Sequence, residues 1–390
     1  MVRKLLFVTL PALAIVGLVL AAAVEVWVRA SWNEKKGVPG FFLSDPRRGQ
    51  RLAANYSGWF AGVPVHINSL ELRDPREYAL EKGPRTFRIL VLGDSVTFGH
   101  GAVYEHTYPY LLEQRLKAWR PGVDWQVWNA AVPGYNTSQE LAQLLEVGPA
   151  FKPNLVVVGF FENDLIDNRP AAAPPGAAIR TGYRLMSFAR RHIYSLELYK
   201  RVALALAWRL SASSDYHRRL EHLDTEESLI AASDQSAAAA QQLTPFEWRG
   251  DEWVRGATCV YGMKPNPSVV PSMRRDPGFD RWVAAVRGFQ DLNRSGAYRI
   301  VFFVNMAPPI CPDGGSDMFY DGGTSALNAF YLSILGDGTP AVSAYDAFLH
   351  ARPSQMPFAS GHAFGNSNVV KAQVLFDFLA TQTQPPAPPR

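Results

Sequence analysis

The first hydrophobic feature of the chain is an uncharged stretch close to its N-terminus. Residues 5–24 contain no charged side chain, and Arg3 and Lys4 precede them. At about 1.5 Å per residue, a helix of this length spans about 30 Å, the thickness of the hydrocarbon core of a bilayer. Cationic residues on the short side predict that this side stays in the cytoplasm and that the remaining chain lies outside it. We therefore predict a membrane anchor over residues 1–29.

The same stretch also fits a second interpretation, a cleaved signal peptide. Three alanines at 21–23 satisfy the small-x-small rule for a cleavage site. The apolar stretch is longer than the usual signal-peptide core of about 7–15 residues, and residues 26–28 prolong it past Glu25. This length favours an uncleaved anchor, and both interpretations place the main part of the chain outside the cytoplasm.

From residue 86 onward, short apolar runs alternate with amphipathic segments. The apolar runs predict buried strands at 87–92, 125–128, 155–160, 299–304 and 341–344. Hydrophobic residues at helical spacing predict helices at 108–119, 279–292, 325–335 and 367–379, with a further helix capped near Thr137 or Ser138 and Glu140 in its first turn. This alternation is typical of βαβ units on a parallel sheet. We predict a flavodoxin-like three-layer α/β/α sandwich with a parallel sheet, preceded by the N-terminal transmembrane helix.

Three further regions do not show this alternation. Residues 30–85 mix Pro, Gly and aromatic residues with one alternating run at 63–67, and are predicted to form a stalk and a cap on the main domain, residues 86–380. An insertion at about 170–277 is predicted to be partly helical and either to roof the site or to meet a partner. The Pro-rich tail at 381–390 is predicted to be disordered.

Composition narrows the possible partners. The net charge is only +4 over 390 residues and the Lys and Arg residues are scattered, so we expect no nucleic-acid partner. Cys259 and Cys311 lie 52 residues apart without metal-ligand spacing, and form either one disulfide or two buried thiols. No metal site and no cofactor are expected. Aromatic residues of the insertion are interpreted as packing residues rather than as a sugar platform: Tyr183, Tyr194, Tyr199 and Trp208.

Three predicted strands end in residues that suit acyl-transfer chemistry. Asp94 and Ser95 follow the first strand, Gly134 follows the second, and Asn163 and Asp164 follow the third. The carboxyl ends of parallel strands meet at one edge of the sheet, where ligands bind. A serine there can attack an acyl carbon when a base takes its proton and hydrogen-bond donors hold the oxyanion. Each segment alone also fits a helix cap or a turn, but their joint order favours a shared site.

These segments closely resemble the SGNH hydrolases, also called GDSL-like lipases and acylhydrolases. The blocks GDSVTFG, PGYNTSQE and FFENDL follow the order of the family, although Glu162 departs from its commonest pattern. His362, shortly before the last predicted helix, occupies the position of the family histidine. The resemblance implies that Ser95 is the nucleophile and His362 the general base. It also implies that the Ser95 and Gly134 amides and the Asn163 side chain form the oxyanion hole.

The resemblance covers roughly residues 65–168 and 279–380. Residues 68–74 look like the N-terminal segment of membrane-tethered bacterial members. It therefore implies a membrane-anchored protein whose catalytic domain lies in the bacterial periplasm or at the cell surface.

One position departs from the family pattern. The family has an aspartate two or three residues before the histidine, which orients and stabilises the imidazole. Here those positions are Ser360 and Ala359. Three explanations remain open: a Ser-His dyad steadied by a backbone carbonyl or by Ser360, an acid supplied from elsewhere such as Asp346, or an enzyme with little activity. Asp94 and Asp164 are further candidates for supporting roles.

The expected function is hydrolysis of an acyl ester through an acyl-enzyme on Ser95. Acetyl or short acyl groups on extracytoplasmic carbohydrate or lipid are the expected substrates. Two alternatives remain, a polysaccharide O-acetyltransferase and a catalytically weak glycan-binding protein with the same cleft. His350, four residues after Asp346, is a minor alternative base, whereas His100 and His106 have no partners at ligand spacing.

Overall fold

The structure is a computed structural model, and it describes residues 8–33, 39–61, 63–166, 168, 177–211, 217, 220, 268–308, 323–351, 358–359, 362–363 and 365–382. Some sequence predictions fall outside these residues. They concern the pairing of Cys259 with Cys311, the role of Ser360, most of the insertion, and the tail after Gln382.

Five parallel strands form the central sheet. They are β5 (Thr86–Gly93), β6 (Asp124–Asn129), β7 (Leu155–Phe160), β8 (Ile300–Val304) and β9 (Ala341–Ser343), in the spatial order β6-β5-β7-β8-β9. All neighbouring pairs are parallel. Numbered along the chain, this order is the 2-1-3-4-5 arrangement of flavodoxin-like folds. The predicted fold class is confirmed, and each predicted strand matches an observed one to within one residue at each end.

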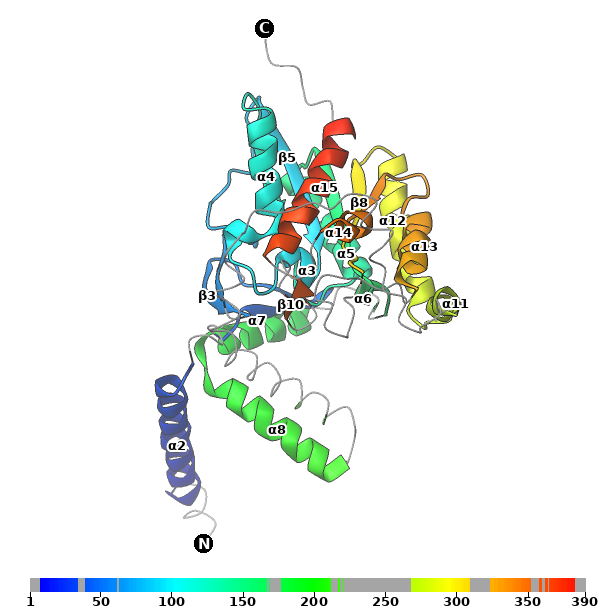
Figure 1. The fold of residues 1–390 in the computed structure, drawn as a ribbon. Helices are drawn as coiled ribbons and strands as arrows, with labels where there is room; N and C mark the ends of the chain where they lie inside the picture. The colour runs from blue at the N-terminus through cyan, green and yellow to red at the C-terminus, as the bar shows by residue number, and fades with distance from the viewer. Residues whose placement is uncertain are drawn as a thin grey trace.

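Helices cover both faces of the sheet (Figure 1). One face carries α5 (Thr137–Phe151), α12 (Phe279–Arg294) and α13 (Thr324–Leu335); the other carries α4 (Tyr108–Trp119), α14 (Tyr345–Leu349) and α15 (Asn366–Gln382). The cap of α5 lies earlier than predicted. Its N-cap is Asn136, because the Asn136 side chain accepts the Gln139 amide at 3.1 Å and the Gln139 side chain returns to the Asn136 amide.

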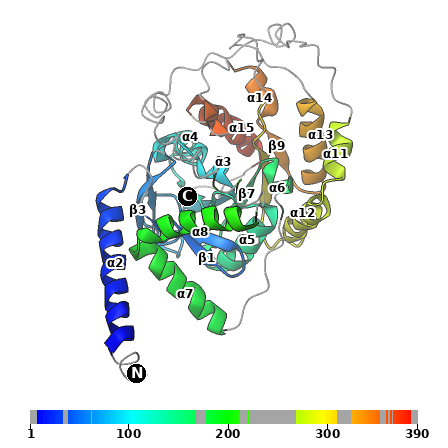
Figure 2. The same cartoon turned by 90° about the horizontal axis from the view of Figure 1, so that it is seen from below.

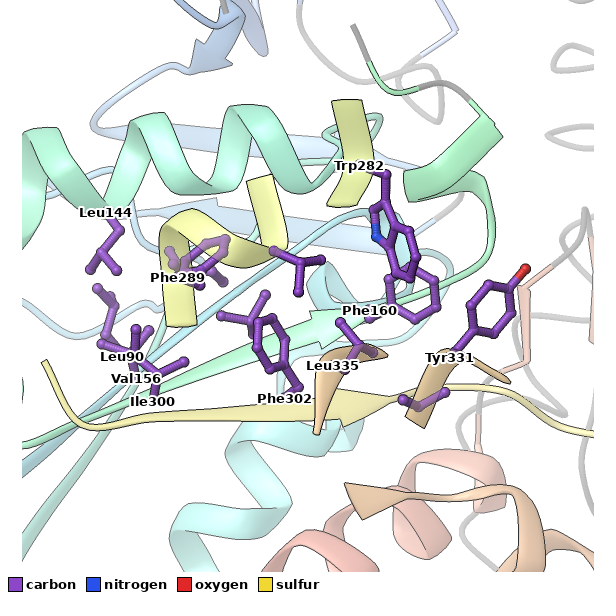
Figure 3. Packing of buried hydrophobic residues seen from close by; sticks show 14 of the residues in the cluster. Leu90, Leu144, Val156, Phe160, Trp282, Phe289, Ile300, Phe302, Tyr331 and Leu335 are labelled. Carbon is purple, nitrogen blue, oxygen red and sulfur yellow. The ribbon is translucent and has the colours of Figure 1, made fainter. Parts of the chain in front are cut away.

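The strand side chains alternate between two cores. Leu90 and Val156 lie on the face of α12, where they belong to one cluster with Trp282 (Figure 3). The next residues along these strands, Val91 and Val157, belong to the second cluster, on the face of α4 and α15. Because helices cover both faces, residues 89–92 of β5 and all of β7 and β8 are apolar without interruption, which explains why short apolar runs predicted these strands well.

Two short hairpins precede the sheet and pack on the domain. β1 (Phe42–Asp45) pairs with β2 (Gly49–Leu52), and β3 (Tyr56–Phe60) pairs with β4 (Val63–Ile67). The alternating run at 63–67 is strand β4, whose side chains are alternately buried and less buried. Apolar residues of these hairpins form a third cluster with Phe98 and Tyr135. The hairpins therefore lie beside the short helix α3 (Ser95–Phe98) that follows β5.

The remaining elements are a 3-10 turn (Tyr104–His106), α6 (Asn163–Ile166), α7 (Ala177–His192), α8 (Ser195–Ser211), α11 (Val269–Arg274), β10 (Phe358–Ala359) and β11 (His362–Ala363). The N-terminal helix α2 (Leu10–Ala30) extends away from the domain (Figures 1 and 2). Its mean hydropathy is 2.2, and by length and composition it is able to cross a membrane.

Two helices of the insertion, α7 and α8, lie near α2 and the first hairpin, whereas α11 contacts α13. Helix α8 contacts α2, and α7 contacts β1. Tyr194, between the two helices, packs edge-on against Trp32 at 5.1 Å, and Trp208 packs against the His217 ring at 4.6 Å. Tyr183, Tyr199 and Trp208 are nevertheless 36%, 43% and 39% exposed, so the interpretation as packing residues is wrong for Tyr183 and Tyr199 and holds only in part for Trp208.

Candidate active site

The turn after β5 is shaped by a close approach of the chain to itself. A Cβ atom on Gly93 would lie 2.2 Å from Oγ1 of Thr97, so only glycine lets the turn fold back over the strand end. Asp94 caps α3, because its Oδ1 accepts the Val96 amide at 2.9 Å. Ser95 is therefore the first residue of a short helix at the carboxyl edge of the sheet. Its own amide is one of the N–H groups for which a helix provides no acceptor.

His362 reaches this serine from the other end of the chain. It lies on β11, which pairs with β10 so that Ala359 stands opposite His362. Nε2 of His362 is 2.7 Å from Oγ of Ser95. When the imidazole proton is on Nδ1, the hydroxyl donates to Nε2, and from this arrangement the ring can take the serine proton. The two residues expected to act as nucleophile and base thus form a hydrogen bond.

A second histidine stacks on His362. The ring centroids of His100 and His362 are 4.2 Å apart and the rings are 17° from parallel. The His100 ring also meets Phe60 of β3 edge-on at 5.3 Å. Burial, helped by the nearby charges of His362 and Arg73, lowers the pKa of His100 to about 3. This ring therefore stays neutral at physiological pH and packs on His362 as an uncharged aromatic surface.

A buried arginine holds the loop that carries His100. The guanidinium of Arg73 donates to the carbonyls of Phe98 and Gly99, both at 2.6 Å, and to the carbonyl of Ala102. It also lies 4.4 Å from the centroid of the Phe98 ring. Burial lowers the pKa of Arg73 to about 9, so it remains a cation at neutral pH. One side chain thus satisfies three carbonyls at the end of α3.

Asn163 lies beside the nucleophile. Its Nδ2 donates to Oδ2 of Asp94 at 3.1 Å, and the same Oδ2 is 3.5 Å from Oγ of Ser95. An amide nitrogen has two hydrogens, so a second one is left for an oxyanion. Asp164, the next residue, accepts the Phe161 amide at 3.1 Å and closes the turn after β7.

Two further buried ionisable residues surround Asp94. Glu140 of α5 is fully buried, and neither of its carboxyl oxygens has a hydrogen-bond partner among the described residues. Burial and the charge of Asp94 raise the pKa of Glu140 well above 4.5. Burial lowers the pKa of Lys371 on α15 to about 8. The negative charge of Asp94 raises this pKa and so reduces the shift.

Of the carboxyls of Asp94 and Glu140, Glu140 is the one whose protonated form is favoured more strongly. Burial raises the pKa of Asp94, but a backbone amide, Asn163 and His362 all favour its charged form. Since no such contact stabilises a charge on Glu140 within the described structure, the negative charge lies on Asp94. Glu140 stands in the first turn of α5, as predicted, but it is fully buried, and the charge of Asp94 opposes its ionisation.

Three more residues were predicted to belong to the site or to support it: Gly134, Asp346 and Ser360. Gly134 lies in the turn after β6 with a φ of +80°, a conformation that favours glycine. Asp346 is exposed on α14, and Ser360 lies outside the described residues. In the part of the chain that the structure describes, no group of three or more His, Cys, Asp or Glu side chains is placed to hold a metal ion.

Sequence reasoning missed the neighbours of the site. His100 has no motif of its own, and only its position five residues after Ser95 relates it to the nucleophile turn. Lys371 did leave a signal, because it stands between Val370 and Ala372 in an apolar helix. A charged residue on the buried face of a helix marks an interior polar site.

Comparison with known proteins identifies the family of the chain. The sequence matches the model of the GDSL-like lipase/acylhydrolase family over residues 91–350. This span is well over half of the chain and includes Ser95, Gly134 and Asn163, whereas His362 lies just beyond it. The chain matches none of the curated proteins with which it was compared.

Solved structures of several esterases are similar to the chain. A lipase/acylhydrolase from Enterococcus faecalis is 12% identical with a TM-score of 0.36, over 77% of this chain and 99% of that one. An acetylxylan esterase from Geobacillus stearothermophilus is 12% identical with a TM-score of 0.36, over 75% and 93%. A GDSL-like lipase from Bacteroides thetaiotaomicron is 11% identical with a TM-score of 0.35, over 76% and 89%. At such low scores, these likenesses carry no information about the substrate.

Proposed function

Because the chain belongs to the GDSL-like lipase/acylhydrolase family, we propose that it is a serine esterase that forms an acyl-enzyme on Ser95. The observation that supports this most directly is the 2.7 Å hydrogen bond between Oγ of Ser95 and Nε2 of His362. At this distance the imidazole can take the hydroxyl proton while the oxygen attacks. The proposed substrates are acetyl or short acyl esters of extracytoplasmic carbohydrate or lipid.

The reaction has two halves. In the first, His362 removes the proton of Ser95 while Oγ bonds to the acyl carbon, and the resulting oxyanion accepts hydrogen bonds from the Ser95 and Gly134 amides and from Asn163. The imidazolium then gives its proton to the departing alkoxide, and the ester C–O bond breaks. In the second half, His362 deprotonates a water molecule that attacks the acyl carbon; the bond from this carbon to Oγ then breaks, the imidazolium returns its proton to Oγ of Ser95, and the acid leaves. Each oxyanion donor is worth about 3 kcal/mol.

Asp94 is proposed to supply the negative charge that the family aspartate supplies elsewhere. An imidazolium forms during each half-reaction, and a nearby carboxylate stabilises it. The attraction between Asp94 and a protonated His362 is one of the effects that favour the charged form of Asp94. The stack with His100 and the β10–β11 pairing support the orientation of the ring. This arrangement accounts for a working site although Ala359 and Ser360 carry no charge.

We also propose that α2 anchors the enzyme in a membrane. Its mean hydropathy of 2.2 and the cationic residues Arg3 and Lys4 before it support a span with the N-terminus in the cytoplasm. The catalytic domain then lies in the periplasm or at the cell surface. The mass of the mature protein tests this, because a cleaved signal sequence would remove the residues before Val24.

The test of the catalytic proposal is labelling with a fluorophosphonate probe, combined with hydrolysis of p-nitrophenyl acetate. The folded protein should be labelled, and Ser95→Ala should abolish labelling and lower hydrolysis by about 10³-fold or more. Ser333→Ala is a matched control, because its hydroxyl only donates to the Phe330 carbonyl on α13. Labelling that persists in Ser95→Ala, or a folded protein that is never labelled, would contradict the proposal.

Product analysis distinguishes hydrolysis from group transfer. Free acid should form at the same rate with and without an added glycan acceptor. If an acylated glycan accumulates instead, the acyl-enzyme on Ser95 stands but the second half-reaction uses a sugar hydroxyl in place of water.

A further inference from the structure

Two helices of the insertion are held at the end of α2 by its only charged residues, Glu25 and Arg29. The carboxylate of Glu25 accepts the Tyr194 amide at 3.0 Å and the Ser195 amide at 2.8 Å, at the N-terminus of α8. Arg29 donates to the carbonyl of His192, the last residue of α7, and its guanidinium lies 4.5 Å from the centroid of the Tyr194 ring. Each charge thus complements the polarity of the helix end it meets. We call α2, α7 and α8 together the docking unit.

Helix α7 turns apolar side chains outward. Leu185 is 69% exposed and Phe188 is 61% exposed. Ser187 and Arg190, which lie on the opposite side of the helix, are half-buried on the side of the domain. Surface helices of soluble domains show the reverse pattern, with the apolar stripe facing the core. The outward face of α7 therefore has the composition of a buried surface.

Helix α8 continues this apolar surface. Tyr199, Val202, Leu206 and Leu210 follow one another at spacings of three and four residues, and so form one stripe. All four are exposed, Leu206 to 55% and Leu210 to 79%. The N-terminal end of α8 contacts α2, a helix that is itself apolar and exposed over most of its length, so the stripe begins near α2.

The docking unit lies at one end of the molecule. Figure 1 shows α7 and α8 at the lower end of the domain, and α2 extends farther from the same end. Helices α3 and α6, which begin at the carboxyl ends of β5 and β7, lie towards this end as well. Seen from that end, α7 and α8 lie in front of the sheet (Figure 2). The site with Ser95 is therefore on the same side of the domain as the exposed apolar helices.

We propose that the outward faces of α7 and α8 bind the surface of the phospholipid bilayer that α2 crosses. Continuity with α2 supports this occupant, since Glu25 and Arg29 fix the two helices where α2 leaves the apolar layer. Charge supports it as well, because α7 and α8 contain seven Arg or Lys residues and one Glu. Apolar stripes flanked by cations are typical of helices that lie in the headgroup region.

Bilayer binding by α7 and α8 orients the catalytic domain. A single spanning helix leaves a domain free to rotate, whereas two additional helices in the interface hold one side against the membrane. The side held is the one where α3 and α6 carry the proposed active site. The inference rests on α2 as an anchor and is independent of whether Ser95 is reactive.

Depth-dependent quenching in nanodiscs tests the inference. In a Cys259→Ser/Cys311→Ser background, single cysteines at Leu185 and Leu206 are labelled with a polarity-sensitive fluorophore. The full-length chain is then placed in phosphatidylcholine/phosphatidylglycerol nanodiscs with or without spin-labelled lipid. Both probes should shift to shorter wavelength and be quenched by the spin-labelled lipid.

Two further positions serve as controls. A cysteine at Val16, within α2, should be quenched strongly, and one at Leu145, 48% exposed on α5, should not be quenched. If Val16 is quenched but the probes on α7 and α8 behave like Leu145, the inference is overturned and the anchor stands. If the probe at Val16 is not quenched either, both the inference and the anchor fail. Fluorophosphonate labelling of each variant reports separately on the proposed function.

Discussion

The surroundings of Ser95 and the docking unit differ in where they place charged and apolar groups. Around Ser95, ionisable side chains are inside the protein. Asp94, Glu140, Lys371 and Arg73 are all buried, and the carbonyls, amides and rings next to them are held in place. In the docking unit, the charged side chains of Glu25 and Arg29 connect α2 to α8 and α7, and apolar side chains face outward.

The difference shows how each region depends on its environment. Buried charges around Ser95 lie in a low dielectric, where each contact shifts pKa values and orients neighbours strongly. Exposed apolar groups of α7 and α8 contribute little to folding, because they leave water only when a partner covers them. Substitutions near Ser95 should therefore change chemistry or stability, whereas substitutions on the outward faces should change neither.

The largest effect is expected for His362→Gln. Gln cannot take the proton of Ser95, so hydrolysis of p-nitrophenyl acetate should fall by about 10³-fold or more while the fold is retained. His350→Gln is the matched control, since His350 follows α14 and was only a minor alternative base. Equal losses in the two variants would mean that the 2.7 Å contact with Ser95 is not the catalytic one.

A smaller loss is expected for Arg73→Met, in stability rather than in chemistry. Met fills a similar volume but leaves the carbonyls of Phe98, Gly99 and Ala102 without their donor. The free energy of unfolding should fall by about 3 kcal/mol. Urea titration in mild detergent, followed by tryptophan fluorescence, measures this change. A loss below about 0.5 kcal/mol, the usual range for surface substitutions, would show that the loop does not depend on this buried cation.

Glu140→Gln should change the pH dependence of stability. In the unfolded chain Glu140 ionises near 4.5, whereas the folded protein keeps the proton because burial and Asp94 raise its pKa. The contribution of Glu140 to stability is therefore greatest below pH 4.5 and declines as the pH rises towards the folded pKa, by up to about 1.4 kcal/mol per pH unit. Gln cannot ionise and lacks this decline.

Urea unfolding at a series of pH values checks the effect of Glu140→Gln. The variant should gain stability over wild type as the pH rises above 4.5, by the linkage just described. Glu81→Gln provides the control, because that side chain is 88% exposed and should show no such trend. A constant difference across the pH range would mean that Glu140 is ionised in the folded protein.

His100→Leu should have a moderate effect on rate. Losing a ring stacked on His362 removes about 0.5–1.5 kcal/mol, which corresponds to a fall in kcat of up to about tenfold. His100→Phe should restore most of the rate, because Phe also presents a flat ring. A purely structural role predicts instead that Leu, which fills the space, works as well as Phe. The pH profile of kcat should shift only in the Leu variant.

The smallest effect is expected for the double substitution Leu185→Ser/Phe188→Ser. Both side chains face outward from α7, so hydrolysis of a water-soluble ester should stay within about twofold of wild type, as is usual for exposed positions. Measured in detergent, this result would sharpen the contrast with the residues around Ser95. A large loss of activity would show instead that this face of α7 packs on the catalytic domain.

Much of the fold could be predicted from the chain alone, for a physical reason. A strand buried on both faces is a nearly continuous apolar run, and the helices that cover it carry an apolar stripe. Both patterns can be recognised within a short segment of the sequence. The runs at 87–92 and 155–160 became β5 and β7 almost unchanged. The order of Ser95, Gly134 and Asn163 at strand ends also predicted a shared edge, because parallel strands end together.

Contacts between distant segments could not be predicted in this way. His362 and Ser95 are 267 residues apart, and only the folded chain brings them within 2.7 Å. Three further features depend on burial and on side chains from other elements. They are the stack of His100 on His362, the protonation of Glu140, and the contacts of Glu25 and Arg29 with α7 and α8. Periodicity reports which face of an element is covered but not what covers it. The local pattern therefore determined the sheet and its helices, and the tertiary structure decided which charged and aromatic groups meet.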